Sequence, residues 1–178
     1  EHIIKRGHPW LFSGAIARIE GKPANGGVLP VCRADGRVVA QAAYNHLSDI
    51  ALRILTLDPG VRIDGAFWRA RIRSAAALRT ALVPESTTAM RLVNAEGDGL
   101  PGLIVDRYGD HLVISISTLL MDRQREELCE ILATELVPAG IYERSEGRAR
   151  QREGRDTRSG MLWGDPPPAR LEVLENNL

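Results

Sequence analysis

Short apolar segments alternate with turn residues in the N-terminal part of the chain. Val28–Cys32, Val38–Tyr44 and Ile50–Leu55 are rich in residues that favour strands. Asp35-Gly36 lies between the first two segments, and an Asp-Gly pair in that position is a strong signal for a short hairpin. Several short strands at this spacing predict a small β-barrel or sandwich that ends near Leu57.

Two segments after the N-terminal strands have the pattern of helices. The segment 64–82 is predicted to form a helix with Asp64 as its N-cap, because an aspartate carboxylate can accept hydrogen bonds from the first free amides. A second helix is predicted over 121–136, where apolar residues recur at i, i+3, i+4 and i+8 and form one stripe. These residues are Leu128, Ile131, Leu132 and Leu136.

Three glycines, Gly97, Gly99 and Gly102, formally match G-x-G-x-x-G, the dinucleotide-binding fingerprint. That fingerprint needs a helix after it, because the helix N-terminus receives the pyrophosphate. Here the glycines are followed by an apolar segment and then by His111–Ser117, which has the alternation of a strand. The pattern therefore predicts a turn between strands, with positive φ at Gly97 and Gly99, and disfavours a nucleotide site.

The remaining segments have weaker patterns. Gly140–Arg144 is predicted to be a strand, residues 144–158 are rich in arginine with little periodicity, and Leu171–Leu174 is predicted to be a last strand. The expected fold class is α+β, with an N-terminal β domain over residues 1–57. A linking helix and a small α+β domain are expected over residues 58–178.

Composition and charge add little to this picture. The net charge of the 178 residues is zero, which does not by itself indicate a nucleic-acid partner. Only Lys5 and Lys22 are lysines, and all other basic side chains apart from histidine are arginines. Arginine suits phosphate contacts, but a general bias of the source genome toward arginine would explain this composition equally well. Because no apolar run could cross a bilayer and no signal segment is present, a cytoplasmic protein without a membrane is expected. Cys32 and Cys129 are expected to be buried free thiols.

Two longer motifs point to a family. They are His8–Ile16, which begins H-P-W-L-F-S-G, and Arg91–Tyr108, which contains D-G-L-P-G. Together with Tyr44-Asn45, Arg53-Ile54 and Tyr142–Ser145, they closely resemble the bacterial 23S ribosomal RNA cytosine-5 methyltransferases of the large-subunit methyltransferase I type. The resemblance covers essentially the whole chain, in the same order.

The resemblance implies a three-domain parent protein. An N-terminal PUA domain, which is a small β pseudo-barrel found in RNA-modifying enzymes, would be followed by a central α+β domain and a C-terminal Rossmann-like domain that binds S-adenosylmethionine. This chain matches the first two domains. Its Glu175-Asn176-Asn177 ending resembles a turn that lacks its partner strand, so we expect the catalytic domain to be absent from this chain. The cofactor would then bind the parent protein and not these residues.

Methylation of C5 of cytosine needs a thiolate that adds to C6. Cys32 lies on a predicted strand and Cys129 on an amphipathic helix, and neither has the setting of a nucleotide pocket, so both are rejected as catalytic. The chain alone is expected to be inactive. Glu96, Asp98 and Asp106 could be taken for metal ligands, but carboxylates near glycine turns are common and no metal is predicted.

The function that remains for the chain is RNA recognition, and the expected partner is 23S ribosomal RNA. Whether the chain forms a homodimer is left open. The alternative is a free-standing PUA-type RNA-binding module without catalysis. For Trp10 the competing interpretation is a place in the core, and for Arg53 it is the solvent face of a strand. The arginine-rich run 144–158 is a second candidate surface. The candidate RNA contacts, which suit phosphate binding or base stacking, are Lys5, Arg6, His8, Trp10, Ser13, Tyr44, Asn45, Arg53 and Arg144.

Overall fold

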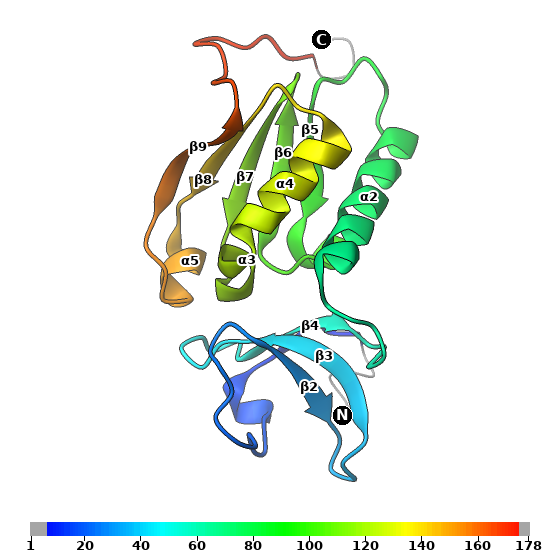
Figure 1. Ribbon diagram of the computed structural model, residues 1–178, viewed down its shortest axis with the longest axis vertical. Coiled ribbons are helices and arrows are strands. Elements are labelled where there is room, and N and C mark those ends of the chain that lie inside the picture. The colour runs from blue at the N-terminus through cyan, green and yellow to red at the C-terminus, as the bar shows by residue number, and fades with distance from the viewer. Residues whose placement is uncertain (1–6, 175–178) are drawn as a thin grey trace.

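A computed structural model describes residues 7–174 of the chain. Two sheets follow one another along the long axis of the molecule, and helices cover one face of the larger sheet (Figure 1). The strands of the smaller sheet are all antiparallel to their neighbours and have the order β1-β4-β3-β2. They are β1 (Trp10–Leu11), β2 (Val28–Cys32), β3 (Val38–Tyr44) and β4 (Leu52–Thr56), with a 3-10 turn η1 (Ser13–Ala15) after β1.

The smaller sheet confirms the strands expected in this part of the chain. It agrees with the expected PUA-like β domain, but its described strands do not close into the expected pseudo-barrel. Within residues 7–174 its strands form an open four-stranded sheet, without the strand pair that would close a barrel. Its own apolar cluster is small and consists of Leu11, Ala42, Tyr44 and Leu52. Ala43 and Leu55, which alternate with these positions, belong instead to the core of the larger sheet.

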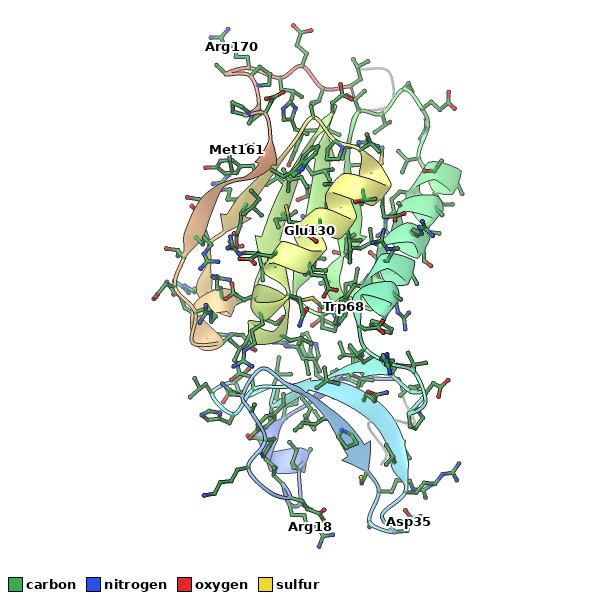
Figure 2. The ribbon with its side chains drawn as sticks, in the orientation of Figure 1. Arg18, Asp35, Trp68, Glu130, Met161 and Arg170 are labelled. Carbon is green, nitrogen blue, oxygen red and sulfur yellow. The ribbon has the colours of Figure 1, made fainter. Side chains whose placement is uncertain are left out.

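Helix α2 (Gly65–Leu82) connects the two sheets and begins where the sequence predicts. The Asp64 carboxylate caps it by accepting hydrogen bonds from the amides of Ala66 and Phe67, at 3.1 and 3.2 Å. Trp68 and Ile72 are buried on its inner side. Trp68 lies near the start of the helix, at the level where the two sheets meet (Figure 2).

The larger sheet has the order β5-β6-β7-β8-β9. Only β7 and β8 are parallel, and helices α3 (Leu119–Arg123) and α4 (Arg125–Leu136) form the crossover between them. Apolar residues from the strands and helices form one continuous core beneath these helices. The strands are β5 (Ala89–Asn94), β6 (Leu103–Tyr108), β7 (His111–Ile116), β8 (Gly140–Ser145) and β9 (Arg158–Gly164), and a short helix α5 (Arg148–Arg152) lies between the last two. The fold class is therefore α+β, as expected.

Three sequence predictions about elements need correction. The helix predicted over 121–136 is two helices that break at Gln124. The arginine-rich run 144–158 contains helix α5 and leads into strand β9, which the sequence analysis missed. Leu171–Leu174 is not a strand, because its contact with the larger sheet consists of hydrogen bonds between Leu174 and Thr88 at the edge.

Candidate functional site

Arg53 joins the two sheets through its guanidinium group. It lies on β4, and only 14% of its side chain is exposed. Nη1 donates to Oε1 of Glu96 at 2.9 Å, and Nη2 donates to Oε1 of Glu153 at 3.0 Å. Glu96 lies in the 3-10 turn η2 (Ala95–Asp98) after β5, and Glu153 follows α5. One arginine of the smaller sheet thus holds two carboxylates that come from distant parts of the larger one.

Trp10 contributes to the same contact. It is directly opposite Arg53 in the pairing of β1 with β4, and the Arg53 guanidinium lies 5.4 Å from the centre of its ring. The indole Nε1 donates to Oε1 of Glu96 at 2.8 Å. Trp10 is therefore half-buried with its polar atom satisfied, which is the usual arrangement for a tryptophan at an internal boundary.

Asn45 completes what we call the junction cluster, which consists of Trp10, Asn45, Arg53, Glu96 and Glu153. The Asn45 amide donates to Oε2 of Glu153 at 2.6 Å and to the Glu153 carbonyl at 3.1 Å, and both residues are buried. These hydrogen bonds link the smaller sheet to segments of the larger sheet's region, so the cluster favours one relative placement of the sheets. Among the described residues, the Arg53 Nε is buried without a hydrogen-bond partner.

Four predicted RNA contacts are therefore engaged inside the protein. Trp10, Asn45 and Arg53 belong to the junction cluster, and Tyr44 is part of the small apolar core. Their direct contact with RNA stays a prediction. Strand alternation allowed a solvent-facing position for Arg53, but its acidic partners lie 43 and 100 residues away and no local pattern indicates them.

The other predicted contacts have different settings. His8 is exposed, and its Nδ1 accepts a hydrogen bond from the Trp10 amide at 3.1 Å. Ser13 is exposed in η1. Arg144 has 70% of its side chain exposed and contacts Glu146 at 3.3 Å. Lys5 and Arg6 lie outside the described residues.

The glycine segment connects two antiparallel strands, as the alternation after it predicts. Gly99 and Gly102 have φ values of 68° and 86°, and a Cβ at Gly102 would lie 2.3 Å from Cγ2 of Thr118. The prediction of positive φ at Gly97 is wrong, since Gly97 lies outside the left-handed region. The glycines are followed by β6 and not by an α-helix, so this turn does not offer the amides that a nucleotide or S-adenosylmethionine needs from a glycine loop.

The carboxylates near this turn are bound to arginines. Asp98 accepts hydrogen bonds from Nη1 and Nη2 of Arg79 at 2.6 and 2.8 Å, and Asp106 accepts from Nε of Arg91 at 2.8 Å. Across residues 7–174, no group of three or more metal-binding side chains comes together. The aspartates therefore act as partners for arginine.

A buried ion cluster within the arginine-rich run was not foreseen. Arg150 is only 2% exposed, and its Nη2 contacts Oδ1 of Asp122 at 2.8 Å while Nη1 donates to the Ile116 carbonyl at 3.0 Å. Arg155 contacts Oδ2 of the same aspartate at 2.5 Å. Burial acts to raise the pKa of Asp122, but hydrogen bonds and charge from Arg150 and Arg155 outweigh it and hold that pKa below its ordinary value. Part of the run is thus internal structure and not free surface.

The two cysteines differ in setting. Cys129 is buried on α4, as expected, and burial raises the pKa of its thiol, which disfavours the reactive thiolate. Cys32 is exposed at the end of β2, so the expectation that it is buried is wrong. The strand prediction for Cys32 is correct, but its side chain is exposed and belongs to neither apolar cluster.

Comparison with known proteins gives consistent results. The model of a PUA-like domain matches residues 1–57. Over its whole length the chain is 36% identical to ribosomal RNA large subunit methyltransferase I of Escherichia coli and 39% identical to the protein of the same name from Shewanella amazonensis. The chain spans 45% of the length of these curated relatives. The resemblance inferred from the motifs is confirmed.

Solved structures share the fold. A protein from Streptococcus mutans that is assigned as a SAM-dependent methyltransferase superimposes with a TM-score of 0.81, at 20% identity, over 100% of this chain and 44% of its own. A second protein assigned as a methyltransferase, in complex with SAH, gives a TM-score of 0.83, also at 20% identity, over 99% of this chain and 44% of its own. Within the described residues, none of the helices has the length and apolar character needed to cross a membrane.

Proposed function

We propose that this chain is the RNA-recognition part of a SAM-dependent ribosomal RNA cytosine-C5 methyltransferase of the large-subunit type I family. In this proposal residues 1–57 form a PUA-like RNA-binding domain and residues 58–178 form the central domain. The chain positions substrate RNA for a methyl transfer carried out by the part of the relatives that it does not span. The similarity over the whole chain, at 36% and 39% identity, is the observation that carries this proposal.

The junction cluster gives the proposal a physical basis. RNA held by a freely tumbling module would sample many positions, whereas RNA held on a docked module is presented in one orientation. Arg53, with carboxylates of Glu96 and Glu153 on its two sides, supplies such docking. We therefore assign Trp10, Asn45 and Arg53 mainly to positioning, although a direct contact of each with RNA remains part of the proposal.

Direct RNA contacts are proposed for the exposed candidates His8, Ser13 and Arg144, and for Lys5 and Arg6 near the N-terminus. Arginine and lysine would neutralise phosphates, and the His8 ring could stack on an unpaired base. Tyr44 would act through the shape of the small sheet, since its side chain is buried.

The chain supplies no catalytic residue in this proposal. The buried Cys129 is a poor nucleophile, and Cys32 stands at the exposed end of a strand away from any described cleft. S-adenosylmethionine is proposed as the cofactor of the parent protein, and we expect it not to bind this chain. The proposed setting is the cytoplasm, with 23S ribosomal RNA as the partner and a homodimer as an additional hypothesis.

Binding to RNA tests the proposal directly. The chain is titrated into a fluorescein-labelled single-stranded fragment of 23S ribosomal RNA at several salt concentrations, and anisotropy gives the dissociation constant. Affinity that falls steeply with salt supports backbone contacts, because each neutralised phosphate contributes about −0.7 to the slope of log K against log salt for single strands. Absence of binding at low salt would refute RNA recognition. Calorimetric titration with S-adenosylmethionine is expected to show no heat of binding.

A further inference from the structure

A cleft of about 460 Å³ lies next to the junction cluster. Strand β4 of the smaller sheet and the residue after it form one wall, and helix α2 and the turn η2 with Gly99 form the other. Its volume is within the range of sites that take one small ligand or one nucleotide. The residues that matter for the argument are Leu57, Arg71, Ser74, Leu78, Glu96 and Gly99.

Arg71 is held in this cleft without an acidic partner. Among the salt bridges of the described residues, none involves Arg71. Its guanidinium lies 5.1 Å from the centre of the Phe67 ring, and Nη1 would be 3.1 Å from a Cβ at Gly99. A planar cation packed between a ring and a glycine backbone has already lost much of its rotamer freedom, so it binds an anion at a lower entropic cost.

The acids of the cleft do not neutralise Arg71. Glu96 accepts hydrogen bonds from Trp10 and Arg53, and Asp98 accepts two from Arg79. Both carboxylates are thus committed to partners behind the wall of the cleft. The Arg71 guanidinium has no hydrogen bond to either carboxylate, so its donors are free to bind an anionic group that enters the cleft.

The other side of the cleft is apolar and open. Leu57 and Leu78 are 57% and 49% exposed, which is high for leucines that line a concave site. A nucleotide has both features that such a cleft would recognise, a phosphate anion and a flat face that can lie against apolar side chains. A duplex would not expose its base faces, so a single-stranded segment fits better.

We propose that this cleft binds one nucleotide of single-stranded RNA, with its phosphate on Arg71 and its base or ribose against Leu57 and Leu78. The inference rests on the proposed RNA-recognition function and adds a contact site to it. The cleft would hold RNA beside the boundary between the two sheets, where the junction cluster fixes their relative placement.

The test compares variants of the full chain in the RNA titration described above. Arg71→Ala is expected to weaken binding about fivefold and to reduce the salt slope by about 0.7, as loss of one phosphate contact on a single strand predicts. Arg71→Lys should recover the slope but only part of the affinity, because lysine keeps the charge and loses the planar fork. Ser74→Trp should weaken binding by filling the cleft. Arg170→Ala is the matched control, since Arg170 lies at the opposite end of the molecule from the smaller sheet (Figure 2).

Crosslinking supplies an independent readout. RNA that carries 4-thiouridine is irradiated with the wild-type chain, and peptides from β4, α2 or η2 are expected among the crosslinked products. If the chain binds RNA but Arg71→Ala changes neither affinity nor salt slope and the crosslinks lie elsewhere, the cleft inference is overturned and the proposed function stands. If the wild-type chain binds no RNA, both fail. Unchanged thermal unfolding of Arg71→Ala would exclude a folding defect as the cause of weaker binding.

Discussion

The two sheets bury their side chains in different ways. The larger sheet has a continuous core of large apolar residues beneath α2, α3 and α4, and residues such as Leu112 and Ile114 are fully buried there. The smaller sheet has only a small cluster of its own and sends Ala43 and Leu55 into the core of its neighbour. The larger sheet can thus be stable by itself, whereas the smaller one depends on docking for part of its burial.

The two polar clusters also differ in whether they lie within one sheet's region or between the two sheets. The Asp122–Arg150 pair lies wholly within the larger sheet and its helices, while the junction cluster lies between the two sheets. Breaking the first should damage the fold of one region, and breaking the second should separate two regions. Four perturbations test this distinction.

Removal of Arg150 is expected to have the largest effect. Arg150→Ala leaves the buried carboxylate of Asp122 without its main partner, and the loss of one member of a buried pair typically costs about 3–5 kcal/mol. Urea unfolding followed by circular dichroism measures the change. Arg148→Ala, an exposed position in the same short helix, is the control and should stay near wild type. An equally small effect at both positions would mean that the buried pair is not important for stability.

Equivalent leucine truncations compare the two cores. Leu112→Ala and Leu52→Ala each remove the same atoms, and such changes cost about 2–5 kcal/mol in well-packed cores. Leu112 is fully buried in the large core, while Leu52 belongs to the small cluster. We expect the greater loss of unfolding free energy at Leu112. A larger loss of unfolding free energy at Leu52 would contradict the view that the smaller sheet has the weaker core and depends on its neighbour.

Arg53→Ala should uncouple the sheets more than it unfolds either one. Its hydrogen bonds to two carboxylates would be lost, and bonds to charged groups are worth about 1.5–3 kcal/mol each at most. Hydrogen exchange measured by mass spectrometry should increase across β1 and β4 and remain unchanged in β7. Arg37→Ala, at an exposed turn of the same sheet, is the control. Uniform exchange across both sheets in Arg53→Ala would show that they unfold as one unit.

The smallest effect expected is a pH dependence from Asp122. Because its arginine partners lower the pKa of Asp122 in the folded chain, its ionised form stabilises the fold above the unfolded aspartate pKa of about 3.9. This contribution is lost as pH falls through the lower, folded pKa. Unfolding midpoints measured from neutral pH down into this acidic range should fall less steeply for Asp122→Asn than for wild type. Parallel curves for the two proteins would contradict the assignment.

Local signals explain what the sequence predicted correctly. Asp64 caps α2 through amides two and three residues away, so the cap is visible in the sequence itself. Strand alternation from His111 onward identified β7 and, with it, the nature of the glycine turn. In each case the residues that determine the structure are neighbours along the chain.

Long-range pairing explains what the sequence missed. Strand β9 contains Gly160 and pairs with β8 through a register shift, so its pattern is irregular. Arg150 looks like any other residue of an arginine-rich run, yet its ion pair with Asp122 on α3 makes it internal. Arg53 likewise has the spacing of an exposed strand residue, and only the approach of Glu96 and Glu153 gives it a buried role. Patterns along the chain carry no information on these partners.

The separation of the partners of Arg53 also constrains the order of folding. Glu96 and Glu153 lie 43 and 100 residues from Arg53, so both ion pairs close long loops whose entropy must be lost before the contacts form. The smaller sheet cannot complete its docking until the turn after β5 and the end of α5 are both in place. A nascent or damaged chain in which the larger sheet is incomplete would leave Arg53 exposed. The final placement of the smaller sheet is therefore expected to follow completion of the larger one.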